Sequence, residues 1–233
     1  MDRMSCRANI GTDEYVIIAR SVIGKDKIEN QDSFKVFSDG SRIIVVVADG
    51  LGSAAFSMEG SKKAVEYACQ ILSTSGSLSS FPETLLARWK ESISGNLALY
   101  DTTIKFLMIT EEKMFFGGIG DGWIALGGPD RYRDLVATNT FSNQTDSILS
   151  FDITEKFVVE SVPAGDYSTL LISTDGFSED VEKESGKEFL EEIEKQITLS
   201  QENFEMDLET TLENWPVQTN CDDKTIVIIQ RGQ

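Results

Sequence analysis

Hydrophobic residues are distributed along the chain in two patterns, one typical of buried strands and one typical of helices. Short runs rich in Val, Ile and Phe recur between polar turns, and such runs favour β-structure. Glu-Glu at 111–112 and Gly-Gly-Pro-Asp at 127–130 are turn-forming sequences that separate neighbouring runs. We therefore predict strands at residues 14–20, 33–37, 42–48, 102–109, 113–119, 122–126, 168–174 and 225–230, with shorter ones at 135–136 and 156–160.

Elsewhere the apolar residues repeat every three or four positions, which is the spacing of one face of a helix. Residues 58–72 carry such a stripe, and a second stripe begins after Pro82 and continues to Tyr100. Two acidic segments, 186–197 and 202–214, are the last predicted helices. Because the helices are grouped apart from strands that turn back on one another, the order favours an α+β fold built on a β-sandwich.

The charge of the chain narrows the possible partners. The 233 residues include 21 Lys and Arg against 39 Asp and Glu, a formal net charge of −18. Such a chain repels phosphate backbones, so we expect no nucleic-acid partner. No apolar run is long enough to cross a bilayer, so we expect no membrane partner either. No linker rich in Pro, Gly or Ser divides the chain, so we expect one domain spanning residues 1–233.

Residue types that are rare or absent narrow the chemistry further. Histidine is absent, which excludes histidine general acid–base catalysis, Ser-His-Asp triads and imidazole-bound zinc. The three cysteines show no metal-ligand spacing or pairing pattern. The first residues are not followed by the apolar core of a signal peptide, so we expect a cytoplasmic protein with reduced thiols. Any reaction must therefore use carboxylates, the backbone and a hard metal ion.

Aspartates recur where a predicted strand meets a turn. They lie in Asn30-Gln31-Asp32, Ala48-Asp49-Gly50, Gly120-Asp121-Gly122, Thr174-Asp175-Gly176 and Cys221-Asp222-Asp223-Lys224. Each motif alone is ordinary turn chemistry. Carboxylates at strand ends can converge at one edge of a sandwich, where they raise one another's pKa unless a cation lies among them. A ligand set made only of oxygen favours Mg²⁺ or Mn²⁺ over zinc.

The five motifs together carry a family resemblance. The sequence resembles the metal-dependent (PPM, type-2C) serine/threonine protein phosphatases in motifs that follow the family order over nearly the whole chain. The matching stretches are Asn-Gln-Asp-Ser-Phe (30–34), Val-Val-Ala-Asp-Gly-Leu-Gly (46–52), Gly-Ile-Gly-Asp-Gly (118–122), Leu-Ile-Ser-Thr-Asp-Gly-Phe-Ser-Glu-Asp (171–180) and Asp-Asp-Lys-Thr-Ile-Val-Ile-Ile (222–229). The resemblance implies a four-layer α-β-β-α sandwich with a metal site at one end of two mainly antiparallel sheets.

The resemblance also implies roles for single residues. Asp49 matches the carboxylate that bridges two Mn²⁺ or Mg²⁺ ions, and the Gly50 carbonyl matches a neighbouring ligand. Asp175 and Asp222 match the other direct ligands. The remaining matches are Asp32, beside the metal-bound waters, Asp121, at a third and weaker metal position, and Glu179, a softer match at that third position.

Three positions depart from the family pattern. Gln31 replaces an acidic residue, so an outer carboxylate becomes a neutral amide. Some eukaryotic members have a histidine at the position of Leu51. At this position the chain resembles many bacterial members. Lys27 stands where the family has an arginine that binds the substrate phosphate, and a lysine lacks the bidentate fork of arginine. Lys25 is the competing candidate for that role, and a solvated loop lysine is the alternative for both.

The expectation that follows is a phosphomonoester hydrolase in which two metal ions activate a water, with Asp32, Gln31 and Lys27 as catalytic residues. Its substrate would be a phosphoprotein, the target of a serine/threonine kinase, and we expect the enzyme to be a monomer. The alternative is a weak or silent domain of the same fold that binds and regulates a partner. The substitutions at Gln31 and Lys27 favour the alternative, and the retained aspartates favour the enzyme.

Overall fold

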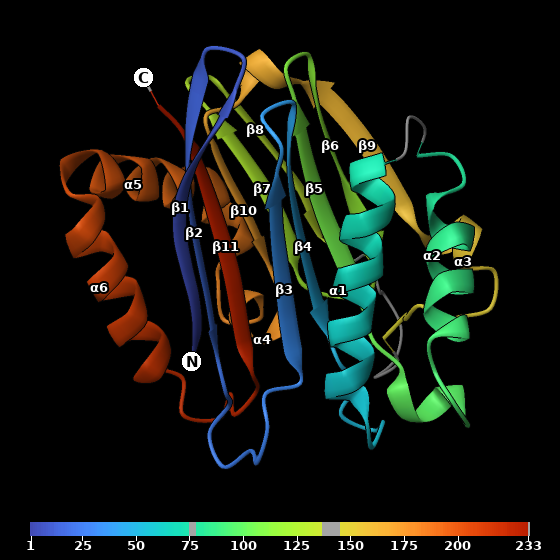
Figure 1. The fold of residues 1–233 in the computed structure, drawn as a ribbon. Coiled ribbons are helices and arrows are strands. Elements are labelled where there is room, and N and C mark those ends of the chain that lie inside the picture. The colour runs from blue at the N-terminus through green and yellow to red at the C-terminus, as the bar shows by residue number, and fades with distance from the viewer. Residues whose placement is uncertain (75–77, 137–144, 233) are drawn as a thin grey trace.

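A computed structural model describes residues 1–74, 78–136 and 145–232. It contains two antiparallel β-sheets, stacked between helices in four layers (Figure 1). Six strands form one sheet in the order β1-β2-β11-β10-β7-β8, and five form the other in the order β3-β4-β5-β6-β9. Their bounds are β1 Asp2–Ile10, β2 Asp13–Val22, β3 Asp32–Ser38, β4 Arg42–Asp49, β5 Ile104–Thr110, β6 Lys113–Ile119, β7 Trp123–Gly128, β8 Arg131–Val136, β9 Val158–Pro163, β10 Thr169–Ser173 and β11 Lys224–Arg231. The predicted α+β sandwich is confirmed.

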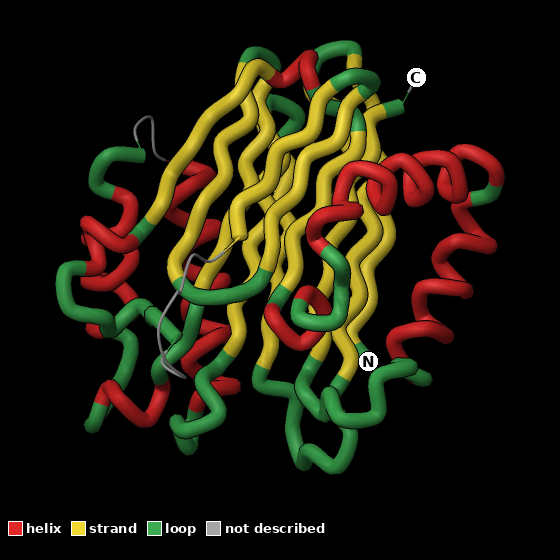
Figure 2. The backbone as a smooth tube through the Cα atoms, turned by 180° about the vertical axis from the view of Figure 1, so that it is seen from behind, coloured by secondary structure: helices red, strands yellow, loops and turns green. Residues whose placement is uncertain are grey.

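Helices cover the outer face of each sheet, and Figure 2 shows the strands lying between the two helical groups. Helices α1 and α2 pack on the five-stranded sheet, and α5 and α6 lie over the six-stranded sheet. The helices are α1 Ser57–Thr74, α2 Phe81–Glu91, α3 Ile153–Lys156, α4 Asp175–Ser178, α5 Gly186–Leu199 and α6 Gln201–Glu213, with 3₁₀ turns at Leu97–Tyr100, Ala164–Asp166 and Lys183–Ser185. None of the helices in the described part of the chain is long and apolar enough to span a membrane.

Strand alternation divides the apolar residues among three cores. On β2, Ile17 packs between the sheets while Ile18 faces the α5–α6 layer. On β5, Leu107 points into the inter-sheet core, and its neighbour Phe106 packs against α1 and α2. Because both faces of these strands are covered, they read as continuous hydrophobic runs, which is why the sequence made them easy to find.

The predicted elements differ from the structure in several places: the short helices α3 and α4 were not predicted, β8 begins at Arg131 and not at residue 135, and β9 spans Val158–Pro163 and not 156–160. Strand β1 was missed, because its inward positions alternate only weakly apolar residues such as Met4, Cys6 and Ala8 with polar ones. The second predicted helix ends at Glu91 and does not continue to Tyr100. Gly95 has a φ of +104° after it, a value that L side chains rarely adopt and that a helix cannot contain.

The register of the sheets brings the aspartate motifs to one end of the sandwich, the lower end in Figure 1. Asp32 at the start of β3 is the direct cross-strand partner of Asp49 at the end of β4. In the other sheet Ser173 pairs with both Trp123 and Ile226, so the turns that precede β7, follow β10 and precede β11 lie together. Residues far apart in sequence thus meet at the mouth between the two sheets.

Candidate metal centre

Three of the predicted ligands converge. Carboxylate oxygens of Asp49, Asp121 and Asp175 lie within 4.8 Å of one another, and all three residues are half-buried. They come from the end of β4, the turn between β6 and β7, and the start of α4. Carboxylate oxygens spaced this closely are a ligand set suited to a hard divalent cation.

The backbone of Asp49 is held so that its carboxylate is left for other partners. Its carbonyl accepts from the Thr103 amide at 2.8 Å and the Thr102 hydroxyl at 2.7 Å, and its amide donates to Thr103 Oγ1 at 3.1 Å. Gly50 follows because a Cβ there would lie 2.7 Å from both the carbonyl oxygen and the Cβ of Ser57, at the start of α1. The glycine therefore lets helix α1 approach the end of the strand.

Asp175 begins helix α4, directly after buried Thr174. The amide of Gly176 donates to Asp175 Oδ1 at 2.7 Å, which fixes one carboxylate oxygen. A Cβ at Gly176 would lie 2.0 Å from the carbonyl oxygen of Asp223, a contact that no side chain tolerates. Glycine at this position is what lets the Asp175 turn pack against the segment that carries Asp222.

Asp32 lies behind this cluster and is 5% exposed. Its Oδ2 accepts from the Thr174 hydroxyl at 2.7 Å, but its buried Oδ1 has no hydrogen-bond partner among the described residues. Burial raises the pKa of Asp32 to about 6, against the hydrogen bond from Thr174, which lowers it. The charge of Asp32 in turn helps to raise the pKa of Asp49.

The electrostatics of the cluster fit a cation. Burial, followed by the charges of the neighbouring carboxylates, raises the pKa of Asp49 well above its usual range. Burial also raises the pKa of Asp175 to about 7, and the charges of Asp121 and Asp222 add to the effect. Both shifts are what burial and mutual repulsion produce when carboxylates are crowded together. Together with the unpartnered oxygen of Asp32 and the all-oxygen donor set, they indicate that Mg²⁺ or Mn²⁺ fits here.

Asp222 and Asp223 lie at the edge of the site and are paired with a lysine. The Lys27 ammonium donates to Asp222 Oδ1 and, at 3.0 Å, to Asp223 Oδ2. Asp223 is buried, and it also accepts from the amides of Gly24 at 2.7 Å and Gln31 at 2.8 Å. Burial opposes the charge on Lys27, but the hydrogen bonds and charges of the two carboxylates outweigh it and raise the pKa of the lysine.

An open, polar cavity of about 610 Å³ lies against this edge. Lys27, Gln31, Glu179 and Asp222 are among its lining residues. Lys25, the competing candidate for phosphate binding, is exposed and is not among them. The structure thus separates the site residues into a converging cluster and a rim, with Gln31 and Glu179 on the rim.

Asp121 is held by its flanking residues and by one hydroxyl. The glycines on either side have φ values of +96° and +95°, which form the tight turn between β6 and β7. The Thr145 hydroxyl donates to Asp121 Oδ2 at 2.6 Å. Glu179 lies near enough to Asp175 for its charge to help raise the pKa of that aspartate.

A buried lysine beside the cluster was missed in the sequence. Lys105 is 3% exposed and its ammonium donates to the Gly120 carbonyl at 2.9 Å. Burial lowers its pKa to about 8, opposed by the charges of Asp121 and Asp175. A signal was present, because Lys105 has the same strand parity as Leu107 and Ile109, which makes it the one charged residue on an inward-facing row of β5.

Other proteins share this fold and these motifs. A family model described as Protein phosphatase 2C matches residues 23–215. RsbX in complex with magnesium is 17% identical, with a TM-score of 0.66 over 98% of this chain and 100% of that one. Serine/threonine phosphatase Stp1 from Staphylococcus aureus is 12% identical, with a TM-score of 0.67 over 97% and 98%.

The catalytic domain of serine threonine protein phosphatase PstP, in complex with two manganese ions, is 17% identical, with a TM-score of 0.65 over 94% of this chain and 99% of that one. At these identities the likeness shows a common fold. A comparison of the sequence with curated proteins finds no match.

Proposed function

The chain belongs to the protein phosphatase 2C family, and on that premise we propose that it is a metal-dependent phosphomonoesterase acting on phosphoserine or phosphothreonine in proteins. The observation that carries the proposal is the convergence of Asp49, Asp121 and Asp175, with the pKa values of Asp49 and Asp175 raised. Repulsion among these carboxylates costs folding free energy, and a bound cation would neutralise it, which makes the cluster a candidate metal site. Because the chain has no histidine, a histidine nucleophile or general acid is excluded for phosphoester hydrolysis.

The proposed roles follow from where the residues lie. Asp49, Asp175 and Asp222 would hold Mn²⁺ or Mg²⁺ together with the Gly50 carbonyl, and Asp121 would serve a third ion. Bound metal would supply positive charge at the phosphoryl group and an activated water. Asp32, with one oxygen bonded to Thr174 and the other without a partner among the described residues, would orient a water and accept its proton.

Lys27 and Gln31 line the open cavity, and we assign them to substrate contact there. The Lys27 ammonium is held at the rim by two carboxylates, so it reaches a phosphoryl oxygen only as a shared point charge. The backbone amide of Gln31 donates to Asp223, and its backbone carbonyl accepts from the Ser61 hydroxyl. Only its side chain is therefore left to contact a substrate in the cavity. Weak, poorly oriented phosphate binding is the expected consequence.

One observation favours a second candidate, a domain of the same fold with little activity that binds and regulates a phosphoprotein. Lys27, at the phosphate-binding position, is paired with Asp222 and Asp223. Because Asp222 is a predicted metal ligand, this pairing occupies both the lysine and one ligand. Restoring the family residues with Gln31→Glu and Lys27→Arg separates the two candidates. A silent domain gains activity from the double change, whereas an efficient enzyme changes little.

The test of the first candidate is hydrolysis of p-nitrophenyl phosphate with Mn²⁺, with and without EDTA. Asp49→Ala should abolish turnover, and Asp130→Ala, at an exposed turn after β7, should leave it intact. Turnover that ignores EDTA, or that survives in Asp49→Ala, would contradict the proposal. We further propose that the chain acts as a single domain and a monomer in the cytoplasm, opposing a serine/threonine kinase, in the manner of bacterial members of the family.

A further inference from the structure

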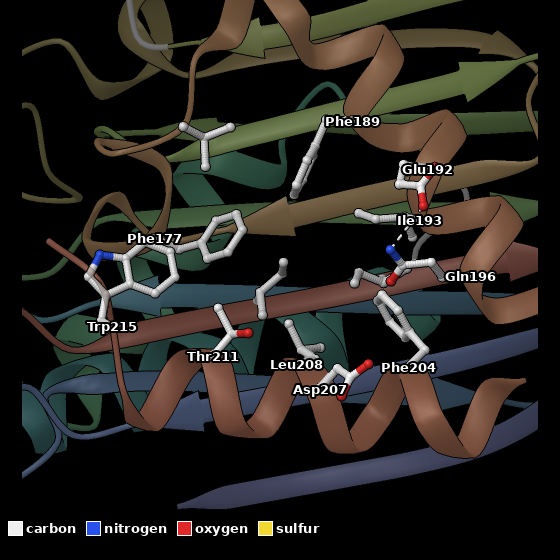
Figure 3. A pocket seen from close by; sticks show the side chains of 13 residues that line it. Phe177, Phe189, Glu192, Ile193, Gln196, Phe204, Asp207, Leu208, Thr211 and Trp215 are labelled. Carbon is white, nitrogen blue, oxygen red and sulfur yellow. Dashed lines mark hydrogen bonds between the residues drawn. The ribbon is translucent and has the colours of Figure 1, made fainter.

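A second cavity lies away from the carboxylates, between α5 and α6. It encloses about 240 Å³ over the outer face of β11 and is lined mainly by apolar side chains. Figure 3 shows α6 along one side and α5 along the other, with Phe177 and Trp215 at one end of the cavity and Phe204 at the other. We call this feature the α5–α6 groove.

The rim of the groove is acidic. Glu192 on α5 and Asp207 on α6 line it from opposite sides, and both are exposed; Glu192 also pairs with Lys195 at 3.0 Å. Between residues 179 and 213 the chain carries 13 acids and three lysines. This charge repels anionic lipids, nucleic acid and a second copy of a chain whose net charge is −18. It attracts a cationic partner that also has apolar side chains to insert.

The size of the cavity suits side-chain anchors. An apolar cavity of roughly 150 Å³ holds a benzene ring, so this one can take one or two anchoring side chains. Two flanking helices leave a trough of the kind that accepts a third helix, read by anchors at i, i+3, i+4 and i+7. We propose that the α5–α6 groove is a docking site for a basic amphipathic helix of a protein partner, and that its occupancy controls the metal centre.

Contacts link the groove to both metal-ligand turns. Phe177 lies in α4, two residues after Asp175, and its ring is 5.5 Å from that of Trp215. Trp215 Nε1 donates to Asp180 Oδ2 at 2.7 Å, and Asn220 Nδ2 donates to the same oxygen at 2.6 Å.

Asn220 then joins the two turns directly. Its Nδ2 also donates to the Gly176 carbonyl at 2.9 Å, and its Oδ1 accepts from the Asp222 amide at 3.1 Å. The ammonium of Lys224 lies 5.4 Å above the Trp215 ring and donates to Asn220 Oδ1 at 3.1 Å. A contiguous set of packed rings and hydrogen bonds therefore runs from the groove to Asp175 and Asp222.

The direction of control follows from packing. Phe177 and Trp215 both line the cavity, so a side chain inserted there packs against them and restrains them. Restraining them restrains the turns that hold Asp175 and Asp222, and this pre-organises the metal centre. The proposed effect of the groove on the metal centre rests on the proposed function, whereas the docking of a helix in the groove does not. We expect an occupied groove to raise the affinity for Mn²⁺ about fivefold, with reciprocal tightening of the helix by Mn²⁺.

The probe is a designed peptide of about 18 residues with Leu and one Phe on a single helical face and Lys elsewhere. Its binding is followed by the change in tryptophan emission, to which Trp215 should contribute most, since it is the tryptophan that lines the groove. We expect saturable binding in EDTA, at least fivefold weaker for a peptide of the same composition in permuted order. The Mn²⁺ affinity is then measured by calorimetry with and without the peptide.

Three variants of the whole chain test the assignment. Glu192→Lys with Asp207→Lys should weaken the peptide at least tenfold. The control, Glu191→Lys with Glu202→Lys, makes the same change on the same helices outside the groove and should leave binding within twofold. Thr211→Phe, an exposed position that faces the cavity, should fill it, weaken the peptide and raise the Mn²⁺ affinity by itself.

Equal loss in the two charge variants, or equal binding of the permuted peptide, overturns the groove as the site. Peptide binding that leaves the Mn²⁺ affinity unchanged overturns the control of the metal centre. Peptide binding in EDTA needs neither metal nor turnover. If the phosphatase proposal is wrong, turnover is absent but the peptide still binds; if the groove is wrong, the peptide does not bind specifically, whatever the turnover.

Discussion

Two groups of carboxylates lie side by side at the mouth of the sandwich, and they differ in how their negative charge is balanced. Asp49, Asp121 and Asp175 converge within 4.8 Å, and burial and mutual repulsion raise the pKa values of Asp49 and Asp175. Asp222 and Asp223 are balanced by the ammonium of Lys27. The first group would be neutralised by a bound cation, and the second is paired with an ammonium of the same chain.

The difference separates carboxylates that need a bound cation for neutralisation from carboxylates that a lysine of the chain already pairs, one of which, Asp222, is also a proposed metal ligand. In the second group, Asp223 accepts from the Lys27 ammonium and from the amides of Gly24 and Gln31. Asp222 accepts from the same ammonium and from the Asp223 amide, so the group stabilises the fold as it stands. The Asp49 group costs folding free energy unless something binds it. Removing charges from the two groups should therefore have opposite effects on stability and unequal effects on metal binding.

The largest expected effect is on Mn²⁺ affinity when one charge is removed from each group in turn. Asp175→Asn should weaken Mn²⁺ at least about 100-fold, because it removes a ligand from the converging cluster. Asp222→Asn should weaken it about tenfold, because that carboxylate is already shared with Lys27. Isothermal titration of both variants measures the ratio, and a larger loss for Asp222→Asn would contradict the comparison.

The second effect is on stability. Lys27→Met leaves Asp223 buried beside its two amide donors with its ammonium partner gone, and we expect the free energy of unfolding to fall by about 2 kcal/mol. Lys27→Arg keeps the charge and should lose less than half as much. Urea unfolding of the metal-free variants measures both values. No loss in Lys27→Met would mean that the pair contributes nothing to the fold.

The fold was largely predictable from the sequence, and the partition of the site was not. Continuous β-branched runs predicted buried strands such as 42–48, and the aspartates that follow them predicted where the strands end at the sheet edge. Convergence depends on the register that pairs Asp32 with Asp49, which spacing along the chain does not give. The pairing of Lys27 with Asp222, 195 positions away, is likewise a product of topology.

The third effect is a pH dependence with opposite signs for the two states of the protein. The raised pKa values of Asp32 and Asp175 stabilise the metal-free fold below their ordinary value of 3.8, and this stabilisation is lost as the pH rises through about 6 and 7. Mn²⁺ competes with protons for the same oxygens, so its stabilising effect should grow over that range.

Thermal unfolding between about pH 5 and pH 8 checks this sign. The melting temperature of the metal-free protein should fall more steeply than that of Asp175→Asn, by about 4 °C over the range, and added Mn²⁺ should raise it more at the upper end. Parallel curves for the protein and its variant would show that the cluster carries no stored repulsion.

The smallest effect concerns the lysine between the sheets. Lys105 places a positive charge near Asp121 and Asp175 without an ion pair to either within the described residues, so it competes weakly with a cation. Lys105→Met should raise the affinity for Mn²⁺ about threefold by calorimetry. Lys35→Met, which removes a charge paired with Glu66 elsewhere on the sandwich, should leave the affinity unchanged.

The central claim, that the converging carboxylates are the metal centre, is tested most directly by anomalous scattering from crystals soaked in Mn²⁺. The expected result is density among the carboxylates of Asp49, Asp121 and Asp175, strong at about pH 8 and weak at about pH 5. Density confined to the Lys27 side of Asp222, or absent at both pH values, would contradict the account.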